Sequence, residues 1–288
     1  MKQRIKPIVG FAFMLLAASL PLLCFGNMLY QNWNQELRYQ SYTKALDPLL
    51  VSKTLDASLQ YNERLGSDNQ IVDPFAGEDY QVDYQVLEDG DGIYGYLSIP
   101  KISLMEPVYL GASATHLSQG LAHVAGTDLP IDGAGVRSVI AGHRGWANQV
   151  FFRHLDKLEA GDDLYFDNGK AILHYKMLPN PKVILPAEWE ELESKSDQNL
   201  ITLLTCDPIP LYNKRLLVDF ERVGVYPKEQ QESQQEIPRD IQLSFQKEGQ
   251  QVVSVVGSSS WLYSGICLLS LFAFILIGHR FVKFLKRN

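Results

Sequence analysis

Cysteine is scarce in this sequence, with three residues among 288. Cys24 and Cys267 lie within long apolar stretches, so the polar region between those stretches holds a single sulfur atom, that of Cys206. A disulfide within that region is therefore excluded. A solitary thiol outside the cytoplasm is exposed to oxidation and gains nothing structurally, so its place at the end of a predicted strand suggests chemistry. The alternative interpretation is a small buried hydrophobic residue.

Basic residues are also few between the two apolar stretches. Seven of the 26 Lys and Arg residues lie in the terminal segments, which contain no Asp or Glu. Residues 31–256 therefore carry 19 basic against 33 acidic side chains, a formal charge of −14. This excess argues against nucleic acid as a partner. The negative charge keeps the region soluble. It could favour basic protein substrates, and the alternative is an ordinary solvated surface.

Spacings typical of metal ligands are missing. No two of the six histidines have such a spacing, and only one cysteine is available outside the apolar stretches. A structural zinc site needs several such ligands close together. We therefore expect no metal and no cofactor.

Charged residues are absent from two long stretches, residues 7–30 and 257–278. Each is long enough to cross about 30 Å of hydrocarbon as a helix. The first has no evident small-x-small cleavage site, so both an uncleaved anchor and a poorly marked signal peptide are open. The basic tail, residues 279–288, is predicted to stay in the cytoplasm. The sequence thus predicts a cell-membrane protein with two spans, 1–30 and 257–278, and an extracellular region between them.

Between the spans, the composition changes twice. Residues 31–92 begin with apolar residues at helical spacing, with Pro48 as a break, and end in an Asp-, Gly- and Gln-rich loop from Gly66 to Gly92. Residues 93–226 then contain a succession of short predicted strands: 93–100, 104–110, 136–141, 162–166, 171–178, 200–206 and 215–225. Short strands with frequent Gly, Pro and Asp indicate a mostly β barrel or sandwich. Residues 227–256 are rich in Gln and Glu and are predicted to be a polar linker.

Strand geometry places the thiol. In a strand over residues 200–206, Thr202, Leu204 and Cys206 share one face. An antiparallel connection to the next strand brings Cys206 beside Arg215. A nearby cation lowers a thiol pKa and can stabilise an oxyanion. The alternative for Arg215 is an ordinary surface arginine at the start of a strand.

His143 is the best candidate for an acid or base. It follows the apolar strand 136–141 in the run Gly-His-Arg-Gly, which predicts an exposed imidazole at the rim of a barrel. His279 lies in the cytoplasmic tail and is excluded by its side of the membrane. For the remaining histidines the sequence favours structural roles: His116, His123, His154 and His174.

These residues together resemble a known family. The pentapeptide Thr-Leu-Leu-Thr-Cys at residues 202–206 resembles the sortase signature T-L-x-T-C, and the settings of His143 and Arg215 resemble the family's other two motifs in the same order. The run Asp-Pro-Phe at residues 73–75 is similar to the lid of class C, pilin-polymerising sortases. The C-terminal span with its basic tail is also typical of that class. The similarity extends over most of residues 31–278.

The resemblance implies an eight-stranded sortase β-barrel with N-terminal helices and a cysteine transpeptidase activity. Cys206 would attack the Thr–Gly carbonyl of an LPxTG-like sorting signal, and a lysine of another pilin subunit would resolve the thioester as an isopeptide bond. His143 would act as acid and base, and Arg215 would hold the substrate and stabilise the oxyanion. The implied partners are pilin subunits and the cytoplasmic membrane. The implied lid is Asp73, Pro74 and Phe75, with Asp73 towards Arg215 and Phe75 towards Cys206.

One segment departs from the family pattern. Many members carry Thr-Pro and a glycine-containing turn after the cysteine, whereas this chain has Asp207, Pro208, Ile209 and Pro210. We expect a stiff loop, and a carboxylate of Asp207 that raises the pKa of the thiol.

Several other function classes compete with that of a pilin polymerase. Within the family the alternative is a housekeeping enzyme that attaches surface proteins to peptidoglycan. Papain-like enzymes place the cysteine before the histidine, and the caspase signature Gln-Ala-Cys-x-Gly is absent. A non-enzymatic scaffold has no need for an unpaired thiol beside an arginine.

Overall fold

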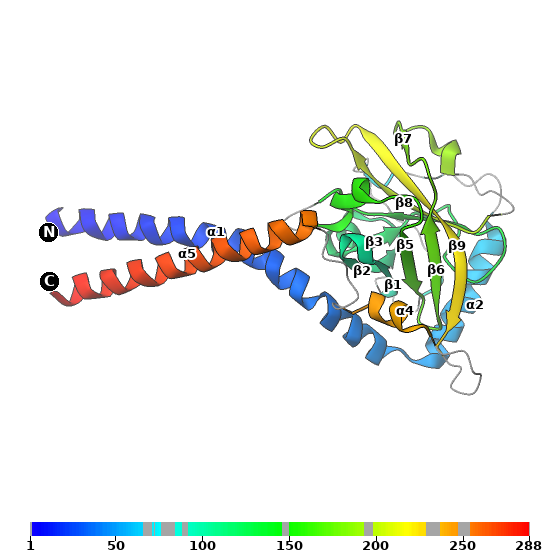
Figure 1. Cartoon of the computed structure of the whole chain (residues 1–288), viewed down its shortest axis with the longest axis horizontal. Coiled ribbons are helices and arrows are strands. Elements are labelled where there is room, and N and C mark those ends of the chain that lie inside the picture. Colours follow the sequence, from blue (N-terminus) through cyan, green and yellow to red (C-terminus); the bar gives the residue numbers. More distant parts are fainter. Residues whose placement is uncertain are drawn as a thin grey trace. The chain divides into compact units, whose positions relative to one another are not determined.

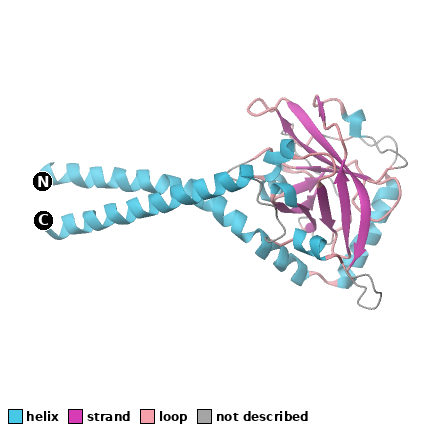
Figure 2. Ribbon diagram, viewed as in Figure 1, coloured by secondary structure: helices cyan, strands magenta, loops and turns pink. Residues whose placement is uncertain are grey.

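A computed structural model describes residues 2–65, 71, 73–75, 84–87, 92–145, 150–192, 198–228, 237–246 and 254–287. The chain divides into two compact units. One unit holds residues 1–34 and 253–288 with 147–149, and the other holds residues 35–146 and 150–252. The second unit contains every residue that the sequence nominates for the site. Figures 1 and 2 show the elements of both units.

The second unit is built on a closed β-barrel (Figure 1). Its strands follow the order β6-β5-β1-β2-β3-β4-β8-β9, and β9 pairs back onto β6, which closes a ring of eight strands among the described residues. The bounds are β1 Ile93–Ile99, β2 Leu104–Leu110, β3 Leu121–His123, β4 Arg137–Ala141, β5 Asp163–Asp167, β6 Ala171–Met177, β8 Leu200–Asp207 and β9 Lys214–Pro227. The predicted eight-stranded sortase-type barrel is therefore confirmed, and β7 (Lys182–Ile184) adds a ninth, short strand to β9.

Strand β8, which carries the thiol, is buried on both faces. Ile201 and Leu203 belong to the main core of the barrel, whereas Leu204 belongs to a second apolar cluster on the opposite face. Because both faces are covered, the strand is mostly apolar without strict alternation, and its two threonines are also buried. Its neighbours are β4, in a parallel pairing, and β9, in an antiparallel pairing. The β4 pairs extend to Leu204, whereas the β9 pairs extend to Asp207 at the end of β8.

Short helices and turns connect the strands. They are η1 Pro100–Ile102, α3 Ala114–Gln119, η2 Phe151–Lys157 and η3 Trp189–Leu192. Strands β3 and β7 have three residues each, and the sequence did not predict either of them. Such short runs carry no periodic signal, and their hydrogen-bonding partners lie elsewhere in the chain.

Two helices precede the barrel. Helix α1 spans Lys2–Ala45 and α2 spans Pro48–Arg64, so the predicted break at Pro48 is present. Pro48 occupies the first turn of α2, where its missing N–H would have no partner anyway, and the Asp47 side chain accepts a hydrogen bond from the Leu49 N–H.

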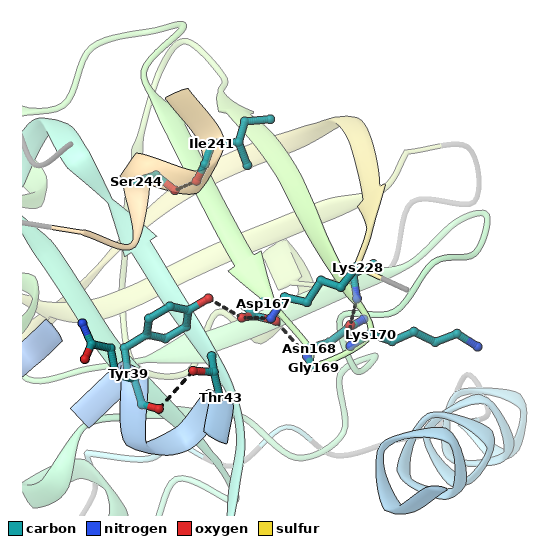
Figure 3. A network of polar contacts seen from close by, with 11 residues as sticks. Tyr39, Thr43, Asp167, Asn168, Gly169, Lys170, Lys228, Ile241 and Ser244 are labelled. Carbon is teal, nitrogen blue, oxygen red and sulfur yellow. Dashed lines mark hydrogen bonds and ion pairs between the residues drawn. The ribbon is translucent and has the colours of Figure 1, made fainter. Parts of the chain in front are cut away.

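The C-terminal half of α1 docks on the barrel through a buried carboxylate (Figure 3). Asp167, at the end of β5, is fully buried and accepts hydrogen bonds from the Tyr39 hydroxyl at 2.7 Å and from the Gly169 N–H at 2.8 Å. Lys228, just after β9, completes an ion pair with the same carboxylate. One acidic side chain therefore joins the incoming helix to the strand that leaves the barrel.

The segment 227–256, predicted as a polar linker, contains a docked helix. Helix α4 spans Arg239–Ser244, and Ile241 and Phe245 are almost fully buried. The Phe245 ring stacks on Tyr39 with 4.7 Å between centroids. Composition alone did not predict this docking, because two apolar side chains in a Gln- and Glu-rich stretch carry little signal.

The other unit is helical, with α5 spanning Ser254–Arg287. Within it, Phe11 of α1 packs against Phe281 and Phe284 of α5, with centroids 5.3 and 5.8 Å apart. Residues Gly265–Phe284 are long and apolar enough to cross a membrane. The apolar part of α1 found among the described side chains, Pro7–Leu23, is shorter, so a second span over residues 7–30 stays a prediction.

Candidate active site

The β8–β9 hairpin places Cys206 and Arg215 directly opposite each other. They are register partners across the antiparallel pair, one pair before the loop of residues 208–213 that connects the two strands. Cys206 is half-buried, whereas only 5% of Arg215 is exposed. A surface-exposed arginine, the alternative interpretation of this residue, is therefore wrong. The sequence-based prediction that the two residues share a site agrees with this register.

His143 reaches the same end of the barrel from β4, and its side chain is partly buried, not exposed as the sequence predicts. Beyond the β4–β8 ladder, the Gly142 N–H donates to the Leu204 carbonyl at 3.1 Å and the Thr205 hydroxyl donates to the Gly142 carbonyl at 2.7 Å. These bonds extend the pairing as far as the residue before His143. A side chain at Gly142 would meet Leu121 at 2.6 Å, so this glycine permits close packing, whereas Gly145, at φ 95°, provides the turn.

Residues 73–75 cover the arginine. Asp73 accepts from Arg215 twice, at 3.1 Å from Nε and at 2.5 Å from Nη2, and the two side chains are only 8% and 6% exposed. Asp73 therefore points towards Arg215, as expected from the sequence. The Phe75 ring lies 5.3 Å from the guanidinium carbon of Arg215 and 5.8 Å from the ring of His143. Phe75 also packs against the second apolar cluster, and its expected direction towards Cys206 stays a prediction.

The turn that holds these contacts is local. The Phe75 N–H donates to the Asp73 carboxylate at 3.0 Å, which closes an Asx turn around Pro74. The rest of the Asp- and Gly-rich loop from Gly66 to Gly92 lies largely outside the described residues.

Burial weakens the charge on both reactive groups. It raises the pKa of the Cys206 thiol; among the charged neighbours, Arg215 lowers this pKa, Asp73 raises it and Arg144 lowers it. Burial also lowers the pKa of His143. At neutral pH the covered site therefore holds mainly a neutral thiol and a neutral imidazole. This arrangement is poorly reactive, because the thiolate is the nucleophile.

Sequence reasoning missed Arg144. Its Nη1 donates to the carboxylate of Asp207, next to the cysteine, at 2.8 Å, and its side chain is 7% exposed. The carboxylate that we expected to act on the thiol is thus paired with a cation. The sequence does show that Arg144 follows His143 and that Asp207 follows Cys206. It does not show that these two residues, 63 positions apart, form a pair.

Three of the other histidines have hydrogen-bond partners away from the thiol. Nδ1 of His116 lies 2.7 Å from the Gly111 carbonyl, and Nε2 of His174 lies 2.7 Å from Asp163. His123 is fully buried against the Tyr84 hydroxyl, and its pKa falls to about 4. The structural interpretation fits all three. Burial also lowers the pKa of His154.

No group of three or more His, Cys, Asp or Glu side chains that could hold a metal ion is found within the described parts of the chain.

Comparison with known proteins agrees with this geometry. A family model described as the sortase domain matches residues 97–223. Sortase A of Bacillus anthracis is 29% identical over 140 residues, which is 49% of this chain and 64% of that protein. The chain therefore spans slightly less than two thirds of the length of this relative.

Solved structures of class C sortases are also similar. Sortase C-3 of Streptococcus pneumoniae is 57% identical, with 67% of this chain and 93% of that chain covered and a TM-score of 0.65. The pilus-related sortase C of Group B Streptococcus is 31% identical, with 65% and 95% covered and a TM-score of 0.58. With a cysteine and an arginine paired across two barrel strands and a histidine loop at the same end, the chain belongs to the sortase family of cysteine transpeptidases.

Proposed function

We propose that this chain is a class C sortase that polymerises pilin subunits, with Cys206 as nucleophile, His143 as acid and base and Arg215 as the group that stabilises the oxyanion. The observation that carries the proposal is the cross-strand pair of Cys206 and Arg215, with Asp73 and Phe75 held against the guanidinium. The likeness to pilus-related sortase C structures supports the choice of pilin as substrate.

In the first step, once the lid has opened, the thiol of Cys206 gives its proton to the imidazole of His143, and the resulting thiolate attacks the Thr carbonyl carbon of an LPxTG-like signal. The carbonyl oxygen becomes an oxyanion that the Arg215 guanidinium stabilises. The C–N bond to Gly then breaks, and the imidazolium of His143 donates its proton to the departing amine. The products are a thioester on Cys206, a neutral His143 and a released Gly-containing tail.

In the second step, the neutral amine of a pilin lysine attacks the thioester carbon. His143 accepts the proton that the amine loses, and the C–S bond breaks to return the thiolate. An isopeptide bond now joins the two subunits. The imidazolium then returns its proton to the thiolate, which restores the neutral resting pair, so the cycle needs no cofactor.

The lid and the substrate compete for Arg215. In the covered site, Nε and Nη2 of Arg215 donate to Asp73, and Nη1 donates to the carbonyls of Tyr212 and Lys214. An oxyanion can gain two parallel donors from the guanidinium only if Asp73 leaves. Residues 73–75 thus act as a lid that must open before acylation.

The anchoring also belongs to the proposal. Residues 257–278, within α5, and residues 1–30, within α1, would hold the barrel of residues 93–226 on the extracellular side of the cell membrane. The basic tail from residue 279 would remain inside. This placement gives Cys206 access to pilin subunits as they leave the membrane.

The second candidate is a housekeeping sortase, which the likeness to sortase A favours. The acceptor amine distinguishes the two functions. Full-length protein in detergent would be incubated with an LPxTG-bearing pilin and a peptidoglycan-precursor amine, and the products analysed by mass spectrometry. Ladders linked through lysine are expected. Transfer to the precursor amine alone would replace the pilin assignment with the housekeeping one.

A further inference from the structure

Arg144 connects the loop that carries His143 to the end of the strand that carries Cys206. It follows His143 on the loop after β4, yet its Nη1 donates to Asp207, the last residue of β8, at 2.8 Å. Its Nη2 lies 3.5 Å from Asp156 on η2. The arginine side chain is 7% exposed, against 21% for Asp207 and 46% for Asp156. Asp207 is therefore the closer and the more buried partner.

The ion pair completes a series of connections between two segments. Gly142 is joined to Leu204 and Thr205 by backbone and hydroxyl hydrogen bonds, and Arg144 is joined to Asp207. These contacts flank His143 on one segment and Cys206 on the other. Removing the outermost one takes away the side-chain connection that joins the two segments beyond His143 and Cys206.

We propose that Arg144 is a positioning residue, whose buried ion pair with Asp207 fastens the His143 loop to the end of the strand that carries Cys206. This inference rests on the proposed function, because it assigns a purpose to holding these two residues together. A buried charge that loses its partner acts on its neighbours, so the pair also keeps the Asp207 carboxylate from acting on the thiol.

The charged groups that face Cys206 come from four elements. Arg215 lies on β9, Asp73 in the lid, Arg144 on the loop after β4, and Asp207 follows the cysteine on β8. Arg215, Asp73 and Arg144 act on the charge of the thiol, and Asp207 is held in an ion pair with Arg144. Loss of one member of the Arg144–Asp207 pair leaves the other without its closest opposite charge.

The opposite charges of Arg144 and Asp207 allow a test that distinguishes a positioning residue from a merely structural one. Arg144 lowers the pKa of Cys206, and in Arg144→Gln the Asp207 carboxylate is also unpaired, so this pKa should rise. In Asp207→Asn the guanidinium is unpaired, so this pKa should fall by a similar amount. The double variant should return it close to the wild-type value. A residue that only supports the fold would move it in one direction or not at all.

The experiment measures the thiol and the reaction separately in the full-length protein. Alkylation of the Cys206 peptide by iodoacetamide is followed against pH by mass spectrometry, and cleavage of an LPxTG peptide gives kcat and KM. We expect kcat to fall about 10-fold to 100-fold in Arg144→Gln and in the double variant, with KM little changed. Arg144→Lys, which keeps the charge and loses the bridging geometry, should retain the alkylation profile and recover kcat only in part.

Two matched controls are available. Asp156→Asn removes the more exposed partner of Arg144, and Arg153→Gln removes an exposed arginine from the neighbouring helix η2. Both should leave the alkylation profile and kcat unchanged. If Arg144→Gln does not fold, Arg144→Lys and Asp207→Asn carry the test.

Unchanged kcat in Arg144→Gln, or a shift of the alkylation profile in the same direction in Arg144→Gln and Asp207→Asn, would overturn the inference. Where Arg144→Gln does not fold, a kcat unchanged in Arg144→Lys or an alkylation profile unchanged in Asp207→Asn would overturn it as well. Failure of the proposed function has a different pattern. A wild-type protein that alkylates normally but neither cleaves the peptide nor forms a thioester would remove the transpeptidase assignment, while the opposite shifts in alkylation would still report on the pair.

Discussion

Opening of the lid should control how fast Cys206 reacts, and Asp73→Ala tests this most directly. The change removes both hydrogen bonds to Arg215 in a pair whose side chains are more than nine-tenths buried. Hydrogen bonds to charged groups contribute about 1.5–3 kcal/mol, and opening rehydrates both partners, so we assign about 2 kcal/mol to the contact. A cation–π contact of Phe75 with Arg215 adds about 0.5–1 kcal/mol.

These values give a total of about 2.5–3 kcal/mol for the closed lid, or about a hundredfold preference over the open one. Alkylation of Cys206 should therefore accelerate by about 30-fold in Asp73→Ala and by about 100-fold when Phe75→Ala is added. The contact is stronger than an exposed ion pair, which contributes about 0–1 kcal/mol, because burial removes most of the competing water.

The pH dependence separates two causes of this acceleration. Asp73 raises the pKa of Cys206, so its removal should lower that pKa and increase the thiolate fraction at neutral pH. At a pH well above the thiol pKa this effect disappears, and the remaining difference reports accessibility alone. The assay is iodoacetamide labelling of the full-length protein across that pH range, with Asp56→Ala, an exposed acidic residue on α2, as control. Equal rates and equal pKa values in wild type and Asp73→Ala would refute the lid.

Three further predictions concern single residues. Cys206→Ala should abolish thioester formation and change thermal stability little, because the residue lies half-buried at a strand end; residual transpeptidation would remove the nucleophile assignment. Arg215→Lys should slow acylation about 100-fold, measured by single-turnover thioester formation, because an ammonium lacks the forked geometry; near-normal rates would exclude Arg215 from the mechanism. The pKa of His123 falls from about 6.5 to about 4 on folding, so its contribution of up to about 3 kcal/mol is present above pH 6.5 and is lost as the pH drops towards 4. His123→Gln should flatten the loss of melting temperature on acidification, and an unchanged slope would assign that loss to other groups.

The barrel and the Cys206–Arg215 pair could be predicted from the sequence because their determinants are local. The two apolar strands follow each other in the chain and pair as a hairpin. The register of that hairpin brings residue 206 opposite residue 215. The apolar strand before His143 similarly predicts that its end reaches the barrel rim. The three-residue strands β3 and β7 could not be predicted, because their pairing depends on neighbours distant in the chain.

Charge pairing was the least predictable part of the site. Asp207 was expected to act on the thiol, since the sequence shows the carboxylate beside the cysteine but not the arginine that packs against it. The docking of α4 and of Tyr39 on the barrel was missed for the same reason. Burial decides the energy of such contacts, and the sequence does not state which polar groups are buried together.

Arg215 has two opposed tasks in this arrangement, and they make its variants informative. The guanidinium donates two hydrogen bonds to Asp73, and in the proposed mechanism it must release Asp73 to bind the substrate oxyanion. Arg215→Lys should therefore loosen the lid and impair the chemistry at once, so that Cys206 alkylates faster while thioester forms more slowly. A residue that acted only in catalysis would slow acylation without speeding alkylation. A residue that acted only as a latch would speed both reactions, since each begins with attack by an uncovered thiolate.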